Sequence, residues 1–192
     1  MSETEVVGDK QTITCLGEQF RVYIDRDRIQ ERVTELGRQI SEDYAGKKPV
    51  LIGVLNGAFM FLADLMRSIS IDCEVDFIKL SSYGAQKITS GVVHELKKID
   101  AEITGRHVIV VEDIVDTGLS MSYLMEKMSS HRPASVTAAT LLHKHEATKV
   151  DINLKYVGFK IKNLFVIGYG LDYGQLARNY PDIYILDEEV DA

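Results

Sequence analysis

The spacing of hydrophobic residues along the chain predicts helices that alternate with buried strands. The first helix follows Asp25, a suitable N-cap residue, and ends before Gly46. The apolar residues of this and two later helices are spaced so that each set lies on one helical face: Ile29, Val33, Leu36, Ile40; Leu62, Leu65, Met66, Ile69; and Met121, Leu124, Met125, Met128. Apolar runs predict strands at 49–55, 73–80, 107–111, 136–142 and 164–167. This alternation predicts a doubly wound α/β fold with a mainly parallel sheet and right-handed crossovers.

Residues 81–93 break the pattern. They are rich in Ser, Gly and Thr, and they have no helical or strand periodicity. A strand at 95–99 would complete a long hairpin with the strand at 73–80. Because long loops in compact domains are often functional, we predict a mobile lid at about 81–94. The 192 residues are enough for one domain with a sizeable core, so we expect a single domain over 1–192.

Charge and cysteine content narrow the function classes. With 22 basic and 29 acidic residues, the net charge of −7 argues against nucleic acid or an anionic membrane as partner. Cys15 and Cys73 lie far apart and form no CxxC pair, which favours a reducing compartment. We expect no leader and no membrane-spanning run, and hence a cytoplasmic protein.

The most informative motif is VVEDIVDTGLSM at residues 110–121. It places Glu112 and Asp113 at the carboxyl end of a predicted strand, where ligands of open parallel sheets bind. These acids could bind sugar hydroxyls and a hydrated Mg²⁺. The following helix offers free N–H groups for a phosphate, Thr117 and Ser120 add hydroxyls, and Gly118 permits close approach. Acid and phosphate sites side by side predict a phosphosugar ligand.

Plainer interpretations of these residues stay open at this point. Asp116 or Thr117 could simply cap the helix, and Asn56-Gly57 could be an ordinary turn. The motif is not a P-loop, because Leu119 stands where the lysine would be. The stretch GYGLDYG at 168–174 has one residue too many for a dinucleotide fingerprint. The five histidines do not form a convincing zinc site.

These residues resemble a known family. Residues 110–121 are similar to the phosphoribosyl pyrophosphate (PRPP) motif of type I phosphoribosyltransferases. The hypoxanthine–guanine branch is indicated by VLNGAFMFLADL at 54–65, SY at 82–83, LLHK at 141–144, and FVIGYGLDY at 165–173 followed by Arg178. The motifs occur in family order between about 29 and 186. The resemblance implies a core at about 26–150 and a small hood from about 10–25 and 151–192.

The resemblance also implies where PRPP binds. The PRPP-binding residues would be Asn56, Gly57, Ser82, Tyr83, Glu112, Asp113, Asp116, Thr117, Gly118, Leu119, Ser120 and Arg178. Residues 116–120 would wrap the 5-phosphate, and the 55–57 turn would receive pyrophosphate, often through a non-proline cis peptide. Mg²⁺ would be the cofactor, with Glu112, Asp113 and Asp172 as ligands. Ser82 and Tyr83 would close over the site and exclude water.

The base would be held by residues from the second half of the chain. Phe165 would stack on the purine, the backbone of Val166 would contact its edge, and Lys144 would donate to the exocyclic O6. Asp172 would be the fourth purine-binding residue. Asp116 would be catalytic, because it would accept the proton that the purine loses as N9 attacks the ribose.

The implied reaction converts hypoxanthine or guanine and PRPP to the nucleotide and pyrophosphate. The expected assembly is a homodimer or homotetramer. Two departures from the family bear on this: Asn56 and Leu164 stand where relatives often have lysine. Leu164 therefore leaves xanthine open as the base, and Lys144 disfavours adenine. A PRPP-sensing regulator is the alternative from another class, although the acidic net charge argues against it.

Overall fold

A six-stranded sheet forms the centre of the computed structural model, which describes residues 12–80 and 95–187. Its strand order is β5-β4-β3-β6-β7-β8. All neighbours are parallel except β4 and β5, which pair antiparallel as the predicted hairpin. The strands are β3 (Val50–Leu55), β4 (Glu74–Leu80), β5 (Glu95–Lys97), β6 (His107–Val115), β7 (Ser135–Lys144) and β8 (Leu154–Ile161). The predicted fold class is confirmed.

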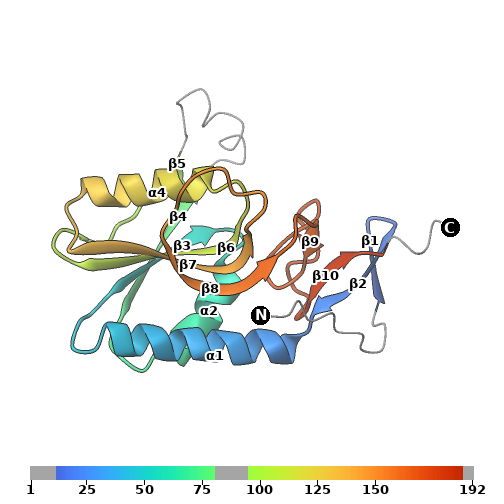
Figure 1. The fold of residues 1–192 in the computed structure, drawn as a ribbon, viewed down its shortest axis with the longest axis horizontal. Helices are drawn as coiled ribbons and strands as arrows, with labels where there is room; N and C mark the ends of the chain where they lie inside the picture. Colours follow the sequence, from blue (N-terminus) through green and yellow to red (C-terminus); the bar gives the residue numbers. More distant parts are fainter. Residues whose placement is uncertain (1–11, 81–94, 188–192) are drawn as a thin grey trace.

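Helices cover both faces of this sheet (Figure 1). α1 (Arg26–Asp43) and α2 (Phe59–Ser68) lie on one face, and α4 (Leu119–Ser130) lies on the other. The alternating side chains of β3 explain this arrangement. Val50 and Ile52 belong to the core under α4, whereas Leu51 belongs to the core under α1 and α2. Each face of a fully buried strand therefore needs its own apolar helix.

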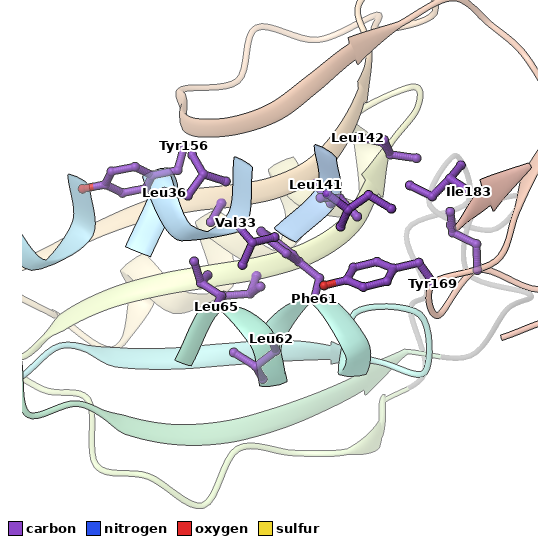
Figure 2. Packing of buried hydrophobic residues seen from close by; sticks show 14 of the residues in the cluster. Val33, Leu36, Phe61, Leu62, Leu65, Leu141, Leu142, Tyr156, Tyr169 and Ile183 are labelled. Atoms are coloured by element: carbon purple, nitrogen blue, oxygen red, sulfur yellow. The ribbon is translucent and has the colours of Figure 1, made fainter. Parts of the chain in front are cut away.

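The predicted helical stripes form these cores. Val33 and Leu36 of α1 pack with Phe61 and Leu65 of α2 and with Tyr156 of β8 (Figure 2). On the opposite face, the methionine-rich side of α4 is core, because Met121, Leu124 and Met128 are all buried. Burial of such side chains stabilises the fold by roughly 1.5–3 kcal/mol each.

A second, four-stranded antiparallel sheet forms the hood, with the order β1-β2-β10-β9. Its strands are β1 (Thr12–Cys15), β2 (Glu18–Ile24), β9 (Val166–Ile167) and β10 (Ile183–Leu186). It lies beside the large sheet, as the right-hand part of Figure 1 shows. Buried Asp182 joins it to α1, because its carboxylate accepts hydrogen bonds from the Arg26 amide at 2.7 Å and the Tyr184 hydroxyl at 3.0 Å.

Three expectations need correction. The hood does not begin at about 151, since β8 pairs with β7 and extends the large sheet to Ile161. The strand predicted at 107–111 continues to Val115, so Glu112 and Asp113 lie inside it. The reason is that the two neighbours of β6 end at different positions. Pairing of β6 with β3 stops at Val111, whereas pairing with β7 continues to Val115. The strand predicted at 164–167 is shorter, and Phe165 precedes it.

Candidate active site

A cavity of about 330 Å³ lies between the carboxyl ends of β6 and β7 and the segment that enters and leaves β9. Its walls combine acidic, basic, aromatic and aliphatic side chains. They come from Asp113, Ile114, Asp116, Lys144, Phe165, Val166, Leu171 and Asp172. A space of this size, lined by four charged and four apolar residues, suits a small ligand that has both polar and apolar surfaces.

Asp116 and Lys144 form an ion pair at this cavity. Asp116 directly follows β6, and Lys144 is the last residue of the neighbouring strand β7. The Lys144 Nζ lies 3.3 Å from the Asp116 Oδ2, with 12% of the lysine side chain and 50% of the aspartate side chain exposed. The pair places a hydrogen-bond donor and an acceptor side by side on one wall.

The idea that Asp116 or Thr117 merely caps the following helix is wrong. The N-cap of α4 is Gly118, and no side-chain hydrogen bond caps this helix. Gly118 has φ +83°, a left-handed conformation that favours glycine, and a Cβ there would collide with Ile152 and Val150. The first amides of α4 are therefore not used by a side-chain cap.

The segment after β7, which contains Thr148 and Lys149, holds residues 116–118 in place by hydrogen bonds. The Thr148 hydroxyl lies 2.9 Å from the Asp116 carbonyl and 3.0 Å from the Lys144 carbonyl. The Lys149 amide donates to the Thr117 carbonyl at 3.0 Å. Sequence reasoning missed Thr148, because nothing in a lone threonine signals a contact with a residue 32 positions away.

Glu112 and Asp113 form an acidic pair with unusual electrostatics. Burial, followed by the negative charge of Asp113, raises the pKa of Glu112 well above its ordinary value. Burial also raises the pKa of Asp113, whose side chain accepts a hydrogen bond from the Ile114 amide at 2.9 Å. Two neighbouring carboxylates favour protonation or a bound cation over two free charges. Within residues 12–80 and 95–187, no cluster of three or more His, Cys, Asp or Glu is arranged to hold a metal ion.

The turn after β3 packs directly against this acidic pair. The Leu55–Asn56 peptide bond is cis, although Asn56 is not proline. A Cβ at Gly57 would collide with the Asp113 carboxylate, and a Cβ at Gly170 would collide with the Gly57 carbonyl. The turn is therefore held between β6 and the hood, and it is more than an ordinary Asn-Gly reversal.

Asp172 and Arg178 face each other in the loop that leaves β9. The Arg178 Nη2 lies 2.6 Å from the Asp172 Oδ1, and the Arg178 Nη1 donates to the Gly170 carbonyl at 2.7 Å. Tyr169 anchors this loop, because its buried hydroxyl donates to Asp64 of α2 at 2.6 Å. The loop is thus tied to α2.

Phe165 presents an exposed ring to the cavity. Half of this residue (51%) is accessible, although it lies next to buried Val166. Its ring centroid is 5.3 Å from that of Tyr173 and 6.4 Å from that of Phe20, both in edge or tilted arrangements. These contacts hold the ring in place, and the exposed part of Phe165 is accessible to a ligand.

The comparisons with known proteins agree with this geometry. The phosphoribosyl transferase domain family matches residues 25–174. The chain belongs to this family. Hypoxanthine-guanine phosphoribosyltransferase of Streptococcus pneumoniae (strain ATCC BAA-255 / R6) is 44% identical, over 88% of this chain and 94% of that protein. A crystal structure of a hypoxanthine-guanine phosphoribosyltransferase from Bacillus anthracis is 46% identical with a TM-score of 0.82, covering 86% of this chain and 98% of that one.

Some relatives are longer than this chain. The bifunctional protein TilS/HprT of Listeria monocytogenes serotype 4b (strain F2365) is 42% identical over 170 residues. That match covers 88% of this chain but 26% of the Listeria protein. The chain therefore spans about a quarter of the length of these bifunctional relatives.

The structure brings six of the predicted site residues together around one cavity. Asp113, Asp116, Lys144, Phe165, Val166 and Asp172 line it, and Gly57 and Arg178 contact the lining residues or their loop. Glu112 adjoins them, and Thr117, Leu119 and Ser120 lie at the start of α4. Ser82 and Tyr83, with the expected lid, lie outside the described residues. Sequence reasoning missed Ile114 and Leu171, whose aliphatic side chains carried no signal beyond that of core.

Proposed function

We propose that this chain transfers the 5-phosphoribosyl group of PRPP to N9 of a 6-oxopurine, giving IMP or GMP and pyrophosphate. The relatives named as hypoxanthine-guanine phosphoribosyltransferases support this activity. The observation that carries the proposal is the Asp116–Lys144 pair at 3.3 Å on the wall of a cavity that also contains Phe165. It offers one acceptor and one cationic donor beside an aromatic ring, which is the complement of a 6-oxopurine edge.

The base-binding roles follow from this arrangement. The Lys144 ammonium would donate to the exocyclic O6, which an adenine lacks, and Phe165 would stack on the ring. The Val166 backbone would contact the base edge. The Asp116 carboxylate would accept the proton from N7 as the N9 lone pair forms the bond to C1 of the ribose and the bond from C1 to pyrophosphate breaks. Half-exposed Asp116 could then pass that proton to water.

The phosphate and sugar would bind along the strand–turn–helix segment. The first amides of α4, with Thr117, Leu119 and Ser120, would hold the 5-phosphate, because a helix N-terminus attracts anions. Glu112 and Asp113 would accept hydrogen bonds from the ribose hydroxyls. Buttressing by Thr148 keeps the turn in place before the ligand arrives, which reduces the ordering cost of binding.

The residues present fit Mg²⁺. Glu112 and Asp113 offer oxygen donors, and the raised pKa of each acid means that a cation would relieve the buried charge. Asp172 offers a third carboxylate on the cavity wall. Because Mg²⁺ keeps water and often takes one or two carboxylates plus phosphate oxygens, these residues suffice without a protein-only cage. When bound, the ion would offset the negative charge that develops on the departing pyrophosphate.

The pyrophosphate would lie between the turn at 55–57 and the loop at 168–178. Amides of Asn56 and Gly57 would donate to it, and Arg178 would add positive charge from its position beside Asp172. We also propose a homo-oligomer, which sedimentation would test, and a cytoplasmic location. No helix in the described part of the chain is long and apolar enough to cross a membrane.

The test is nucleotide formation by the purified protein with PRPP, Mg²⁺ and each purine supplied separately. Hypoxanthine or guanine should be converted, and chelation of Mg²⁺ should stop the reaction. Asp116→Asn should lower kcat by at least about 100-fold, because it removes the proton acceptor. Asp72→Asn is the matched control, since Asp72 is 81% exposed and pairs with Lys48. Tight PRPP binding without conversion of any base would refute the enzyme and favour a regulator.

A further inference from the structure

Two of the cations at the proposed active site are already paired with carboxylates. Lys144 faces Asp116 at 3.3 Å, and Arg178 faces Asp172 at 2.6 Å. Each pair is close to neutral as a unit. A departing pyrophosphate carries several negative charges, but Lys144 is assigned to the base, and Asp172 already offsets part of the charge of Arg178.

Lys79 differs from both. Its Nζ donates to the neutral side-chain oxygen of Asn56 at 3.1 Å. Among residues 12–80 and 95–187, no carboxylate lies within 4.0 Å of this ammonium. An ammonium has three N–H donors, so the bond to Asn56 leaves donors for another acceptor. The Lys79 ammonium is therefore held in position by Asn56, and no acidic side chain within residues 12–80 and 95–187 neutralises its charge.

The sheet places this charge beside the turn at the end of β3. In the parallel ladder of β3 and β4, Lys79 is the partner of Leu55, the residue before Asn56. Gly57 follows in the same turn and packs on Asp113, which lines the cavity. Lys79 is thus connected to the cavity wall through a turn of two residues.

We propose that Lys79 binds the pyrophosphate group of PRPP, and of free pyrophosphate in the reverse reaction. This inference rests on the proposed function, since it adds a residue to the pyrophosphate subsite. Lys79 supplies the positive charge at the 55–57 turn, and Asn56 holds the ammonium through a neutral acceptor that does not cancel the charge. Because the contact is with phosphate oxygens alone, Lys79 affects pyrophosphate and PRPP binding and leaves base binding unchanged.

The experiment compares Lys79→Met with Lys79→Arg in steady-state kinetics of both directions. Lys79→Met should raise KM for pyrophosphate and for PRPP by about tenfold, as expected for loss of a charge-assisted hydrogen bond. KM for hypoxanthine and the melting temperature should stay unchanged, and Lys79→Arg should stay within about threefold of the wild type because it keeps the charge. Lys48→Met is the control, since Lys48 is 72% exposed and pairs with Asp72 outside the cavity lining.

The outcomes are distinct. An unchanged KM for pyrophosphate and PRPP in Lys79→Met would overturn the assignment. So would an equal rise in KM for hypoxanthine or a lower melting temperature, since either would show a structural role. Wild-type protein that forms no nucleotide would instead refute the proposed function itself, so the two failures are distinguishable.

Discussion

Replacing Asp76 with asparagine should destabilise the fold next to the base of the hairpin formed by β4 and β5. Asp76 is a buried residue of β4 whose carboxylate accepts hydrogen bonds from four donors. Its Oδ1 accepts from the Phe77 amide at 2.6 Å and the Lys97 Nζ at 3.0 Å. Its Oδ2 accepts from the amides of Asp100 at 2.5 Å and Ala101 at 2.8 Å. One side chain thus joins β4 to the segment that follows β5.

The magnitude follows from the pKa of this carboxyl. Burial by itself would raise the pKa, but the hydrogen bonds from Ala101, Phe77, Lys97 and Asp100 outweigh burial and lower it from 3.8 to about 2. That difference corresponds to about 2.5 kcal/mol in favour of the charged, folded form. Asparagine has one acceptor oxygen, so two amides would face an NH₂ group. We therefore expect Asp76→Asn to lower the free energy of unfolding by at least about 2 kcal/mol at pH 7.

The assay is urea unfolding followed by circular dichroism at one protein concentration. Because the folded-state pKa is depressed, the stabilisation is present above pH 3.8 and is lost as the pH falls through about 2. The difference in the free energy of unfolding between the wild type and Asp76→Asn should therefore be about 1 kcal/mol smaller at pH 3 than at pH 7. Asp72→Asn, at an 81% exposed side chain, should change stability by less than about 1 kcal/mol. Two results would refute this reasoning. One is a loss of unfolding free energy below about 1 kcal/mol for Asp76→Asn, and the other is a difference from the wild type that does not become smaller at pH 3.

Two further predictions concern the turn and the loop around the cavity. Gly57→Ala places a Cβ against the Asp113 carboxylate, so kcat/KM should fall by at least about tenfold while circular dichroism still shows the native fold. Wild-type kinetics in this variant would contradict the close packing. Tyr169→Phe keeps the ring but removes the 2.6 Å hydrogen bond to Asp64, so urea unfolding should show a loss of about 1.5–3 kcal/mol. Unaltered stability would mean that this bond does not anchor the loop.

Periodicity predicted the elements whose buried faces are continuous. The stripe of Ile29, Val33, Leu36 and Ile40 became the inner face of α1, and Asp25 is its N-cap with a 2.9 Å bond from the Arg28 amide. A helix needs one apolar face and local caps, and both are visible in a short window of sequence.

Strand β8 was missed for the opposite reason. Its sequence LKYVGFKI is mostly half-buried, with Gly158 and two lysines, so it shows neither a clean alternation nor an apolar run. Its place in the sheet is stabilised from outside, since Arg32 of α1 donates to the carbonyls of Val157 and Gly158. Such support comes from a residue more than 120 positions away and leaves no local pattern.

The sequence by itself determined the chemical content of the site: two adjacent acids, a glycine before a helix, a lysine at the end of one strand and an aromatic residue beside another. Only the tertiary structure decided which of them meet. Asp116 reaches Lys144 across 28 positions because parallel neighbours β6 and β7 end at the same edge. Gly57 reaches Gly170, and Lys79 reaches Asn56, for the same kind of reason. Local sequence determines local conformation, whereas long-range neighbours depend on strand order and register, which the whole core sets together.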